Sequence, residues 1–493
     1  MSETKYIVVA GSIMSGLGKG IVTSSVAKLL QARGYRVFPL KFDGYLNVDC
    51  GTMNPFRHGE VFVLDDGTEV DMDFGTYERF LNMSLPGSAS ITGGKIFQRV
   101  IEKERKGDYL GRDVQFVPHL TDEIKARIRE YSTQTQAEIV MIEVGGTVGD
   151  LENGYFLEAV RQLASEENVL FMQLTYVPSL SPSEQKTKPT QHANRLLLSM
   201  GIKPEIILAR EQEELSEDAK EKIAMFCNVD RDAVFDDPLV DTVYELPLVF
   251  EKQNMYGVIA RKLGLDPKKD ANLEGWRKAV ERIKKPKNSL KVALVGKYSK
   301  VKDAYVSILE ALVHSGAEVN ARVQCDILDA EKIEKGDVKE VLKGYDAVLV
   351  PGGFGKRGVE GKISAIRHAR ENGIPYLGLC LGMQMMVIEY ARNVAKLEGA
   401  NSTEFDDKTP YPVIDILPEQ KQITKKGATM RLGQYEMILK KDTAGFCCYP
   451  NGTASERHRH RYEVNPEYVK KLEDAGLVIC GTNPKNEIVE MAE

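Results

Sequence analysis

Several features are scarce in this 493-residue chain, and each absence argues against a class of protein. The seven cysteines form no Cys-x-x-Cys pair and no zinc-ligand spacing, which argues against a zinc module or a disulfide scaffold. No run approaches the ~18 apolar residues of a membrane-spanning helix. Basic and acidic residues number 66 and 72, so no large nucleic-acid-binding face is expected.

No charged leader precedes the first strand pattern, and the cysteines have no partners arranged for disulfides, so we expect a cytoplasmic protein that is not exported. What is present is 42% hydrophobic residues, 28% charged residues and 42 glycines. This is the composition of a soluble α/β protein. The length favours two large domains.

Strand and helix patterns alternate in two series, in the rhythm of parallel sheets covered by helices. The first series predicts a helix at Ile21–Gln31 and strands at Tyr6–Ala10, Arg36–Leu40, Glu138–Val144, Val169–Leu174 and Glu205–Leu208. The second predicts a helix at Ala304–His314, another after Cys380, and strands at Lys291–Val295, Ala347–Val350 and Tyr376–Leu379. We therefore predict two doubly wound α/β domains, residues 1–265 and 290–493. Residues 266–289, with one helix around Leu273–Lys284, are predicted to link them.

A glycine-rich loop, Gly11–Gly20, lies between the first strand and the first helix. Its central residues are Ser15, Gly16, Leu17, Gly18, Lys19 and Gly20. Such a loop directs backbone N–H groups at a phosphate, with Lys19 as the point charge. It is P-loop-like rather than a standard P-loop, because Gly20 replaces the Ser or Thr that would hold magnesium. A purely structural turn is the alternative.

Carboxylates must then supply the metal ligands, since magnesium prefers hard oxygen atoms. Asp73 and Glu143 are the candidates, and Glu143 ends an apolar strand, where open α/β sheets bind ligands. For Asp71 or Asp150 alone, an ordinary capping or salt-bridging role would suffice. Lys186 and Lys188 flank a threonine before a helix-starting proline, a layout that collects phosphate oxygens. Taken alone, this lysine pair is more typical of a solvated face.

Together these segments resemble the amidoligase domain of the CTP synthase family, and the similarity extends over essentially the whole chain. It is carried by the motifs Met53–Phe62, Tyr77–Phe80, Arg105–Gly111, Glu143–Asp150 and Lys186–His192. The resemblance implies a ligase that phosphorylates O4 of UTP with ATP and then lets ammonia displace phosphate at C4. This fits the residues, because phosphoryl transfer needs mainly positioned cations.

The resemblance also implies roles for individual residues. Lys19 and Lys41 would contact ATP phosphates and the transferring group, and Asp73 and Glu143 would hold Mg²⁺. The residues implied for UTP or CTP are Ser15, Asp150, Glu152, Lys186, Lys188, Gln191, Lys222 and Phe226. Glu152 and Phe226 belong to the product-feedback pocket, His58 and Val61 to the ammonia passage, and Leu110 to a lid linked to activation by GTP.

Four positions differ from the residues that are usual in the family. Gly44 stands where proline is normal, and Thr76 where histidine is frequent. Asn153 and Ser183 stand where serine and glycine are usual. The charged ligands are unchanged. Glycine in place of proline raises the conformational entropy of the unfolded chain, which lowers the free energy of unfolding by about 0.4–1 kcal/mol. We expect these changes to affect affinity and CTP feedback more than the reaction itself.

The second series contains Gly378-Leu379-Cys380-Leu381-Gly382, a strand-to-helix elbow that exposes a nucleophile. A buried core cysteine is the alternative. With Pro351–Gly355 the elbow resembles a class I glutamine amidotransferase. The resemblance implies an oxyanion hole at Gly353 and Leu381, and glutamine binding by Gln384, Glu404 and Arg461.

That family activates the thiol with a downstream His-Pro-Glu segment. The only histidines after Cys380 are His458 and His460, in a segment that matches a different family motif. We therefore expect a truncated amidotransferase-like domain without glutaminase activity, and amination by free ammonia. The alternatives are an idle nucleotide-binding scaffold that assembles with intact synthetases, and a dethiobiotin-synthetase-like ligase, which would lack the second domain. A homotetramer is expected from the resemblance, and filaments are possible.

Overall fold

The computed structural model describes residues 3–12, 14–181, 184–297, 301–416 and 429–493. Ile13 of the glycine-rich loop and Ser183, one of the unusual positions, lie outside these ranges. The chain forms two compact units, Met1–Asp49 with Asp73–Lys284, and Cys50–Met72 with Lys285–Glu493. This division differs from the linear one predicted from the sequence, because the helix expected in the linker belongs to the first unit and residues 50–72 belong to the second.

The first unit is built on a parallel sheet that has seven strands within the described residues, in the order β11-β10-β7-β1-β6-β2-β5. The strands are β1 (Lys5–Ala10), β2 (Val37–Asp43), β5 (Ser90–Thr92), β6 (Ile139–Val144), β7 (Val169–Tyr176), β10 (Ile206–Glu211) and β11 (Val234–Pro238). The predicted strands of this series are confirmed, and they read as apolar runs because both faces of the sheet are covered. The sequence did not reveal β5, which is short, or β11, which carries two aspartates.

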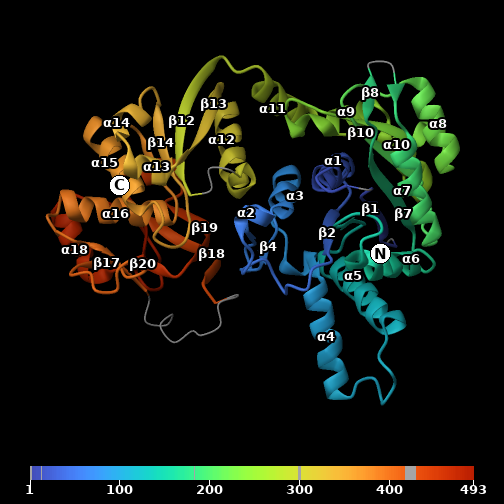
Figure 1. Ribbon diagram of the computed structural model, residues 1–493, viewed down its shortest axis with the longest axis horizontal. Helices are drawn as coiled ribbons and strands as arrows, with labels where there is room; N and C mark the ends of the chain where they lie inside the picture. The colour runs from blue at the N-terminus through green and yellow to red at the C-terminus, as the bar shows by residue number, and fades with distance from the viewer. Residues whose placement is uncertain (1–2, 13, 182–183, 298–300, 417–428) are drawn as a thin grey trace. The chain divides into compact units, whose positions relative to one another are not determined.

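Helices lie on both sides of this sheet (Figure 1). They are α1 (Lys19–Gln31), α3 (Asp73–Leu81), α4 (Gly93–Lys106), α5 (Thr121–Thr135), α6 (Gly154–Leu163), α7 (Lys188–Ser199), α8 (Glu217–Cys227), α9 (Leu246–Lys252), α10 (Met255–Leu263) and α11 (Glu274–Lys284). One core includes Val26 and Leu29 of α1 with Ile7 of β1. Trp276 and Val280 of α11 pack with Phe80 and Tyr244, which fixes this helix to the first unit.

The second unit contains a parallel sheet in the order β13-β12-β14-β15. The second series predicts β12, β14 and β15, but the sequence analysis missed β13. Its strands are β12 (Asn288–Gly296), β13 (Ala321–Asp329), β14 (Ala347–Val350) and β15 (Tyr376–Gly378). Its helices include α12 (Val306–Glu318), α13 (Ala330–Lys335), α14 (Val338–Val341), α15 (Val359–Asn372), α16 (Leu381–Asn393), α17 (Ala444–Cys448) and α18 (Pro466–Asp474).

Two further sheets with antiparallel pairing lie in the described part of residues 401–492, and the sequence analysis missed both. They contain β16 (Asn401–Ser402), β17 (Pro412–Ile416) and β20 (Tyr462–Val464), and β18 (Arg431–Leu439), β19 (Thr453–His460), β21 (Ile479–Thr482) and β22 (Val489–Ala492).

The segment 50–72 joins the second unit through charged contacts with β19. Arg457 Nε donates to Asp65 Oδ1 at 2.5 Å, and Arg459 Nε donates to Glu69 Oε1 at 2.7 Å. Arg459 also donates to the carbonyl of Gly51 at 3.1 Å. The segment carries α2 (Pro55–His58), β3 (Phe62–Val63) and β4 (Glu69–Val70). Because Glu69 is buried, removing its arginine partner would leave an unpaired charge, so the pair holds the segment in place.

Short hairpin strands β8 (Ser179–Ser181) and β9 (Glu184–Gln185) precede α7. None of the helices in the described ranges is long and apolar enough to cross a membrane.

Candidate active sites

The glycine-rich loop connects β1 to α1 at the carboxyl edge of the seven-stranded sheet. Gly18 caps α1 with φ 89° and ψ 36°, a left-handed conformation that favours glycine. Its carbonyl accepts the N–H of Val22 at 3.0 Å, which starts the helix. Lys19 begins α1, and its Nζ donates to the carbonyl of Gly146 at 2.6 Å. The loop therefore holds an amine where the ends of β1 and β6 meet.

Gly20 explains why the loop lacks the hydroxyl of a standard P-loop. A Cβ atom at Gly20 would lie 2.5 Å from Asp73 Oδ1. A serine or threonine would collide with this carboxylate, which comes from the start of α3 and occupies the space of the missing side chain. The predicted replacement of a hydroxyl ligand by a carboxylate thus has a steric basis in the first unit.

Lys41 and Glu143 complete this group of charges. Lys41 forms an ion pair with Asp73 and lies 3.8 Å from Asp43 Oδ1. Glu143 accepts a hydrogen bond from the hydroxyl of the buried Tyr77. The structure therefore brings Lys19, Lys41, Asp73 and Glu143 to one edge of the sheet. Tyr77 and Asp43 belong to the same group, although sequence reasoning assigned neither a role.

The electrostatics of this group follow from burial and crowding. Burial, and then the nearby negative charge of Asp73, raises the pKa of Glu143 to about 7. Burial also lowers the pKa of the Lys19 amine. A divalent cation would relieve the repulsion that Asp73 exerts on the ionised Glu143, so these two carboxylates fit Mg²⁺. No group of three or more His, Cys, Asp or Glu with metal-binding geometry occurs in the described ranges. The remaining ligands would then be water and phosphate oxygens, as is usual for magnesium.

Four of the eight residues predicted for UTP or CTP lie on α7 and α8. Lys188 Nζ lies 5.3 Å from the ring centre of Phe226 and donates to Gln191 Oε1 at 3.3 Å. The structure thus brings these three residues together. Lys186 forms an ion pair with Glu184, and Lys222 lies 2.5 Å from Asp218 Oδ2. Each of these two lysines is exposed enough to exchange its carboxylate partner for a phosphate.

Asp150 has the capping role that the sequence analysis considered for it. Its carboxylate accepts the Thr147 N–H at 2.7 Å and the Thr147 hydroxyl at 2.9 Å, which closes the turn after β6. The exposed Glu152 follows in the next turn, and Phe226 is 45% exposed on α8. Leu110, 87% exposed with φ 53°, lies in the segment that follows the end of α4 at Lys106.

Gly44 and Asn153, two of the positions that are unusual for the family, lie against each other. A Cβ atom at Gly44 would lie 2.4 Å from Asn153 Oδ1 and 2.7 Å from the Glu152 carbonyl oxygen. The buried Asn153 therefore requires the small residue that replaces proline at position 44. Thr76 accepts a hydrogen bond from Arg79 Nη2 at 3.2 Å on the same helix.

Cys380 has the geometry of a nucleophile elbow. It precedes α16 with φ 53° and ψ −106°, a strained conformation for a residue with a side chain. Gly382 packs so closely on β14 that a Cβ would lie 2.1 Å from the Val350 carbonyl oxygen. Cys380 as a residue is exposed, but neighbouring protein atoms desolvate its sulfur. This desolvation, followed by the charges of Glu463 and Glu404, raises its pKa to about 11.

The predicted glutamine-binding residues come from several elements of the second unit. The Gly355 N–H donates to Glu404 Oε1 at 2.6 Å, and Gln384 Nε2 donates to the Tyr462 carbonyl at 2.9 Å. Arg461 Nη2 donates to the Thr429 hydroxyl at 2.7 Å. Gly353 lies against Leu381, since its Cβ would be 3.7 Å from Leu381 Cδ2. The two predicted oxyanion-hole positions are therefore neighbours.

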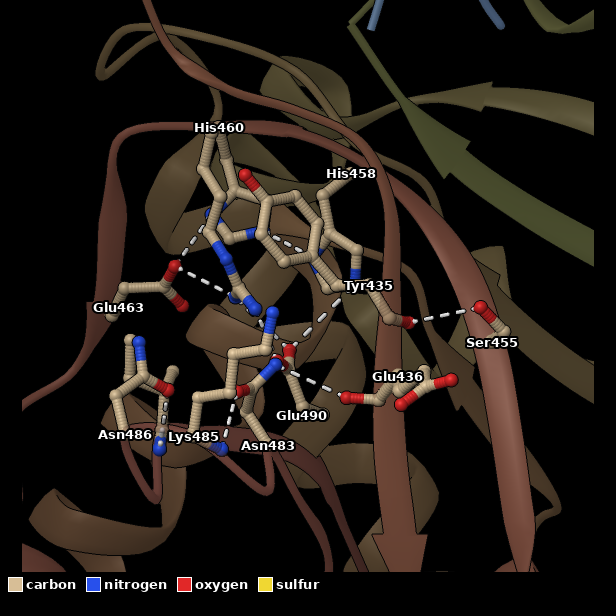
Figure 2. A network of polar contacts seen from close by, with 12 residues as sticks. Tyr435, Glu436, Ser455, His458, His460, Glu463, Asn483, Lys485, Asn486 and Glu490 are labelled. Atoms are coloured by element: carbon tan, nitrogen blue, oxygen red, sulfur yellow. Dashed lines mark hydrogen bonds and ion pairs between the residues drawn. The ribbon is translucent and has the colours of Figure 1, made fainter. Parts of the chain in front are cut away.

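His458 and His460 belong to a buried polar network on β19 (Figure 2). Nδ1 of His458 and Nε2 of His460 are 2.9 Å apart, a hydrogen-bond distance. His460 Nδ1 lies 3.3 Å from Glu463, and His458 Nε2 lies 3.7 Å from Glu490. Arg431 bonds both carboxylates. Burial and the Arg431 charge lower the pKa of His458 to about 4, and burial with His458 lowers that of His460 to about 3. Both histidines are therefore neutral members of a structural network.

Comparison with known proteins identifies the family. The profile of the CTP synthase N-terminus matches residues 5–265, and that of the class-I glutamine amidotransferases matches residues 300–493. A CTP synthase of Methanosarcina mazei is 52% identical over 99% of this chain and 92% of its own length. The chain belongs to the CTP synthase family.

Other relatives in the CTP synthase family are similarly close. One from Thermococcus kodakarensis is 52% identical over 97% of this chain and 90% of its own length. One from Thermus thermophilus is 51% identical over 97% of this chain and 88% of its own length. A solved structure of the glutaminase domain of Trypanosoma brucei CTPS with bound acivicin has 39% sequence identity. It covers 39% of this chain and 75% of that chain, with a TM-score of 0.37.

Proposed function

We propose that the chain converts UTP into CTP by ATP-dependent amination at C4 of the uracil ring. The observation that supports this most strongly is the group Lys19, Lys41, Asp73 and Glu143 at the carboxyl edge of the sheet. It combines amines for phosphate oxygens with carboxylates for magnesium behind a glycine-rich loop. An idle scaffold would have no use for carboxylates placed to bind a metal, and a dethiobiotin-synthetase-like ligase would not carry the second unit.

The chemistry assigned to these residues is phosphoryl transfer followed by displacement. The uracil carbonyl is a poor electrophile until its oxygen becomes a leaving group, so O4 attacks the γ-phosphorus of ATP first, and ADP leaves as the bond between the γ-phosphorus and the bridging oxygen breaks. Lys19 and Lys41 neutralise the charge on the transferring group, which favours a loose transition state. Mg²⁺, when bound by Asp73 and Glu143, would neutralise ATP phosphate charge. Ammonia then attacks C4, and phosphate leaves with the O4 atom.

UTP is proposed to bind along α7 and α8. Lys186, Lys188 and Lys222 would take the triphosphate, and Gln191 would add an amide donor. Ser15 and Asp150 would face the nucleotide from the loops that follow β1 and β6. Glu152 and Phe226 would recognise cytidine when CTP acts as a feedback inhibitor, and GTP is the proposed activator, with Leu110 in the lid.

We also infer that the 493-residue chain takes ammonia from solution. A thiol with a raised pKa needs a base, and both histidines downstream of it are held neutral by Arg431, Glu463 and Glu490. Glutamine would therefore bind near Gly353, Gln384, Glu404 and Arg461 without being hydrolysed. A cytoplasmic homotetramer, able to form filaments, is the proposed state of assembly.

The test is UTP-to-CTP conversion by the purified chain with ATP and Mg²⁺, using ammonium chloride or glutamine as the nitrogen source. CTP formation with ammonium chloride supports the proposal. Nucleotide binding without CTP formation from either source would favour the scaffold instead.

A further inference from the structure

A fully buried lysine lies behind the elbow of Cys380 and has no part in the chemistry above. Lys362, in the first turn of α15, has no exposed surface. Within the described part of the chain, its Nζ donates to the Pro351 carbonyl at 3.3 Å. An ammonium group has three protons to donate, and burying it is costly unless charges or dipoles compensate. A lysine in this position therefore calls for an explanation beyond packing.

The fold prevents Lys362 from reaching water. Gly361 lies so close to α13 that a Cβ would be 1.9 Å from the Ala330 carbonyl oxygen, which fixes the first turn of α15. Gly358 caps the helix with φ 68°, and its carbonyl accepts the N–H of Lys362 at 3.2 Å. The backbone of Lys362 is thus held on both sides, and its amine is directed under the loop that starts at Pro351.

That loop lies against the nucleophile. A Cβ on Gly352 would be 3.5 Å from the Cβ of Cys380 and 3.8 Å from its sulfur. The Pro351 carbonyl that Lys362 bonds belongs to the neighbouring residue. The lysine therefore contacts the backbone next to the oxyanion-hole position at Gly353.

The charged groups around Lys362 and Cys380 come from several elements. Glu463 and Glu404 raise the pKa of Cys380, whereas Lys362 lowers it. Lys297, which directly follows β12, donates to the Phe354 carbonyl at 2.9 Å and repels the Lys362 ammonium. Burial, followed by Lys297, lowers the pKa of Lys362 to about 7, and Cys380 opposes this shift. Lys362 thus favours the thiolate against two carboxylates.

We propose that Lys362 is a positioning residue of the Cys380 elbow, which holds the Pro351 carbonyl and supplies the positive charge that favours a Cys380 thiolate. This inference does not depend on amination of UTP, because the reactivity of the thiol can be measured without nucleotides. The competing explanation is that Lys362 only fills space with its aliphatic stem, and the experiment separates the two.

The rate of Cys380 alkylation by iodoacetamide is measured from pH 6 to 10 by mass spectrometry of the Cys380 peptide. Lys362→Met keeps the stem and removes the charge. The matched control is Lys356→Met, which removes an exposed amine from the same loop. At pH 6, where Lys362 with its pKa of about 7 is mostly protonated, we expect alkylation about tenfold slower in Lys362→Met than in the parent chain, since one pKa unit is a factor of ten in thiolate. We expect a rate within about twofold of the parent chain in Lys356→Met. Identical pH profiles for the parent and Lys362→Met would overturn the proposal.

If Lys362→Met does not fold, the parent chain provides a second measurement. A plot of log rate against pH should have a shallower section near pH 7, where Lys362 loses its proton and its support for the thiolate. The same section should persist in Lys356→Met. A plot that rises with constant slope through this range would overturn the proposal.

Discussion

Lys41 and Glu143 are register partners on the neighbouring parallel strands β2 and β6. Lys41 and Glu143 are both buried, and the backbone hydrogen bonds of the sheet fix their spacing. Charges held in this way need little reorganisation when a substrate arrives, which is the condition for effective electrostatic catalysis.

The first prediction concerns Lys19. Lys19→Ala should lower ammonia-dependent CTP formation by about a hundredfold or more, because it removes a positioned phosphate-compensating charge. Its melting temperature should stay close to that of the parent chain, since the amine contributes no core packing. Lys268→Ala, which removes an exposed charge from the same unit, is the control. Parent-like turnover in Lys19→Ala would refute the assigned role.

The second prediction concerns the metal carboxylates. Asp73→Asn or Glu143→Gln should abolish magnesium-dependent CTP formation, because an amide lacks the anionic oxygen that this cation prefers. The measurement is a magnesium titration of the ammonia-dependent rate. Asp71→Asn is the control and should respond like the parent. A parent-like titration of both variants would mean that the metal binds elsewhere.

The third prediction concerns Cys380. Since desolvation of its sulfur raises its pKa to about 11, the thiol stays protonated at neutral pH unless a base acts on it. Glutamine-dependent CTP formation by the 493-residue chain should be undetectable, and ammonia-dependent formation should persist. Cys380→Ala should change neither rate. A glutamine-dependent rate that disappears in Cys380→Ala would reveal another base.

The fourth prediction tests the pairing of Gly44 with Asn153. Gly44→Ala should lower the free energy of unfolding by about 1–3 kcal/mol, because the new methyl group overlaps Asn153 and the Glu152 carbonyl. Asn153→Gly should recover part of this loss in the double variant, measured by urea unfolding of all four chains. Additive losses would show that the two positions act independently.

The fifth prediction concerns Glu211, whose carboxylate oxygens have no hydrogen-bond partner of good geometry within the described residues. Burial, followed by Asp236 and Asp237, raises its pKa to about 9 from 4.5. The folded protein therefore keeps this proton while the unfolded chain loses it, so stability falls as pH rises from 4.5 to 9.

Replacing Glu211 with leucine should remove that pH dependence. Glu211→Leu should stabilise the protein at pH 8 by about 1–3 kcal/mol, and by less at pH 5. The measurement is urea unfolding at both pH values. Glu214→Leu, at an exposed position nearby, should show no such difference. An equal effect of Glu211→Leu at pH 5 and pH 8 would contradict the raised pKa.

The local hydrophobic pattern of the sequence predicted most of the central strands of the first unit. Apolar runs predicted β1, β2, β6, β7 and β10 within about three residues at each end, because strands buried on both faces tolerate few polar residues. Strand β11 was missed since Asp236 and Asp237 interrupt its pattern. Their partners, Lys220 and Arg210, lie 16 and 27 residues away.

The sequence by itself determined the alternation of strands and helices, the turn at Gly18 and Lys19, and the elbow at Cys380, because each depends on residues close together along the chain. Only the tertiary structure decided that Asp73 fills the space beside Gly20, and that Lys362 lies under Pro351. It also decided that residues 50–72 join the second unit, since Arg457 and Asp65 are 392 residues apart. Such contacts arise from packing and charge pairing between distant segments, and no local periodicity records them.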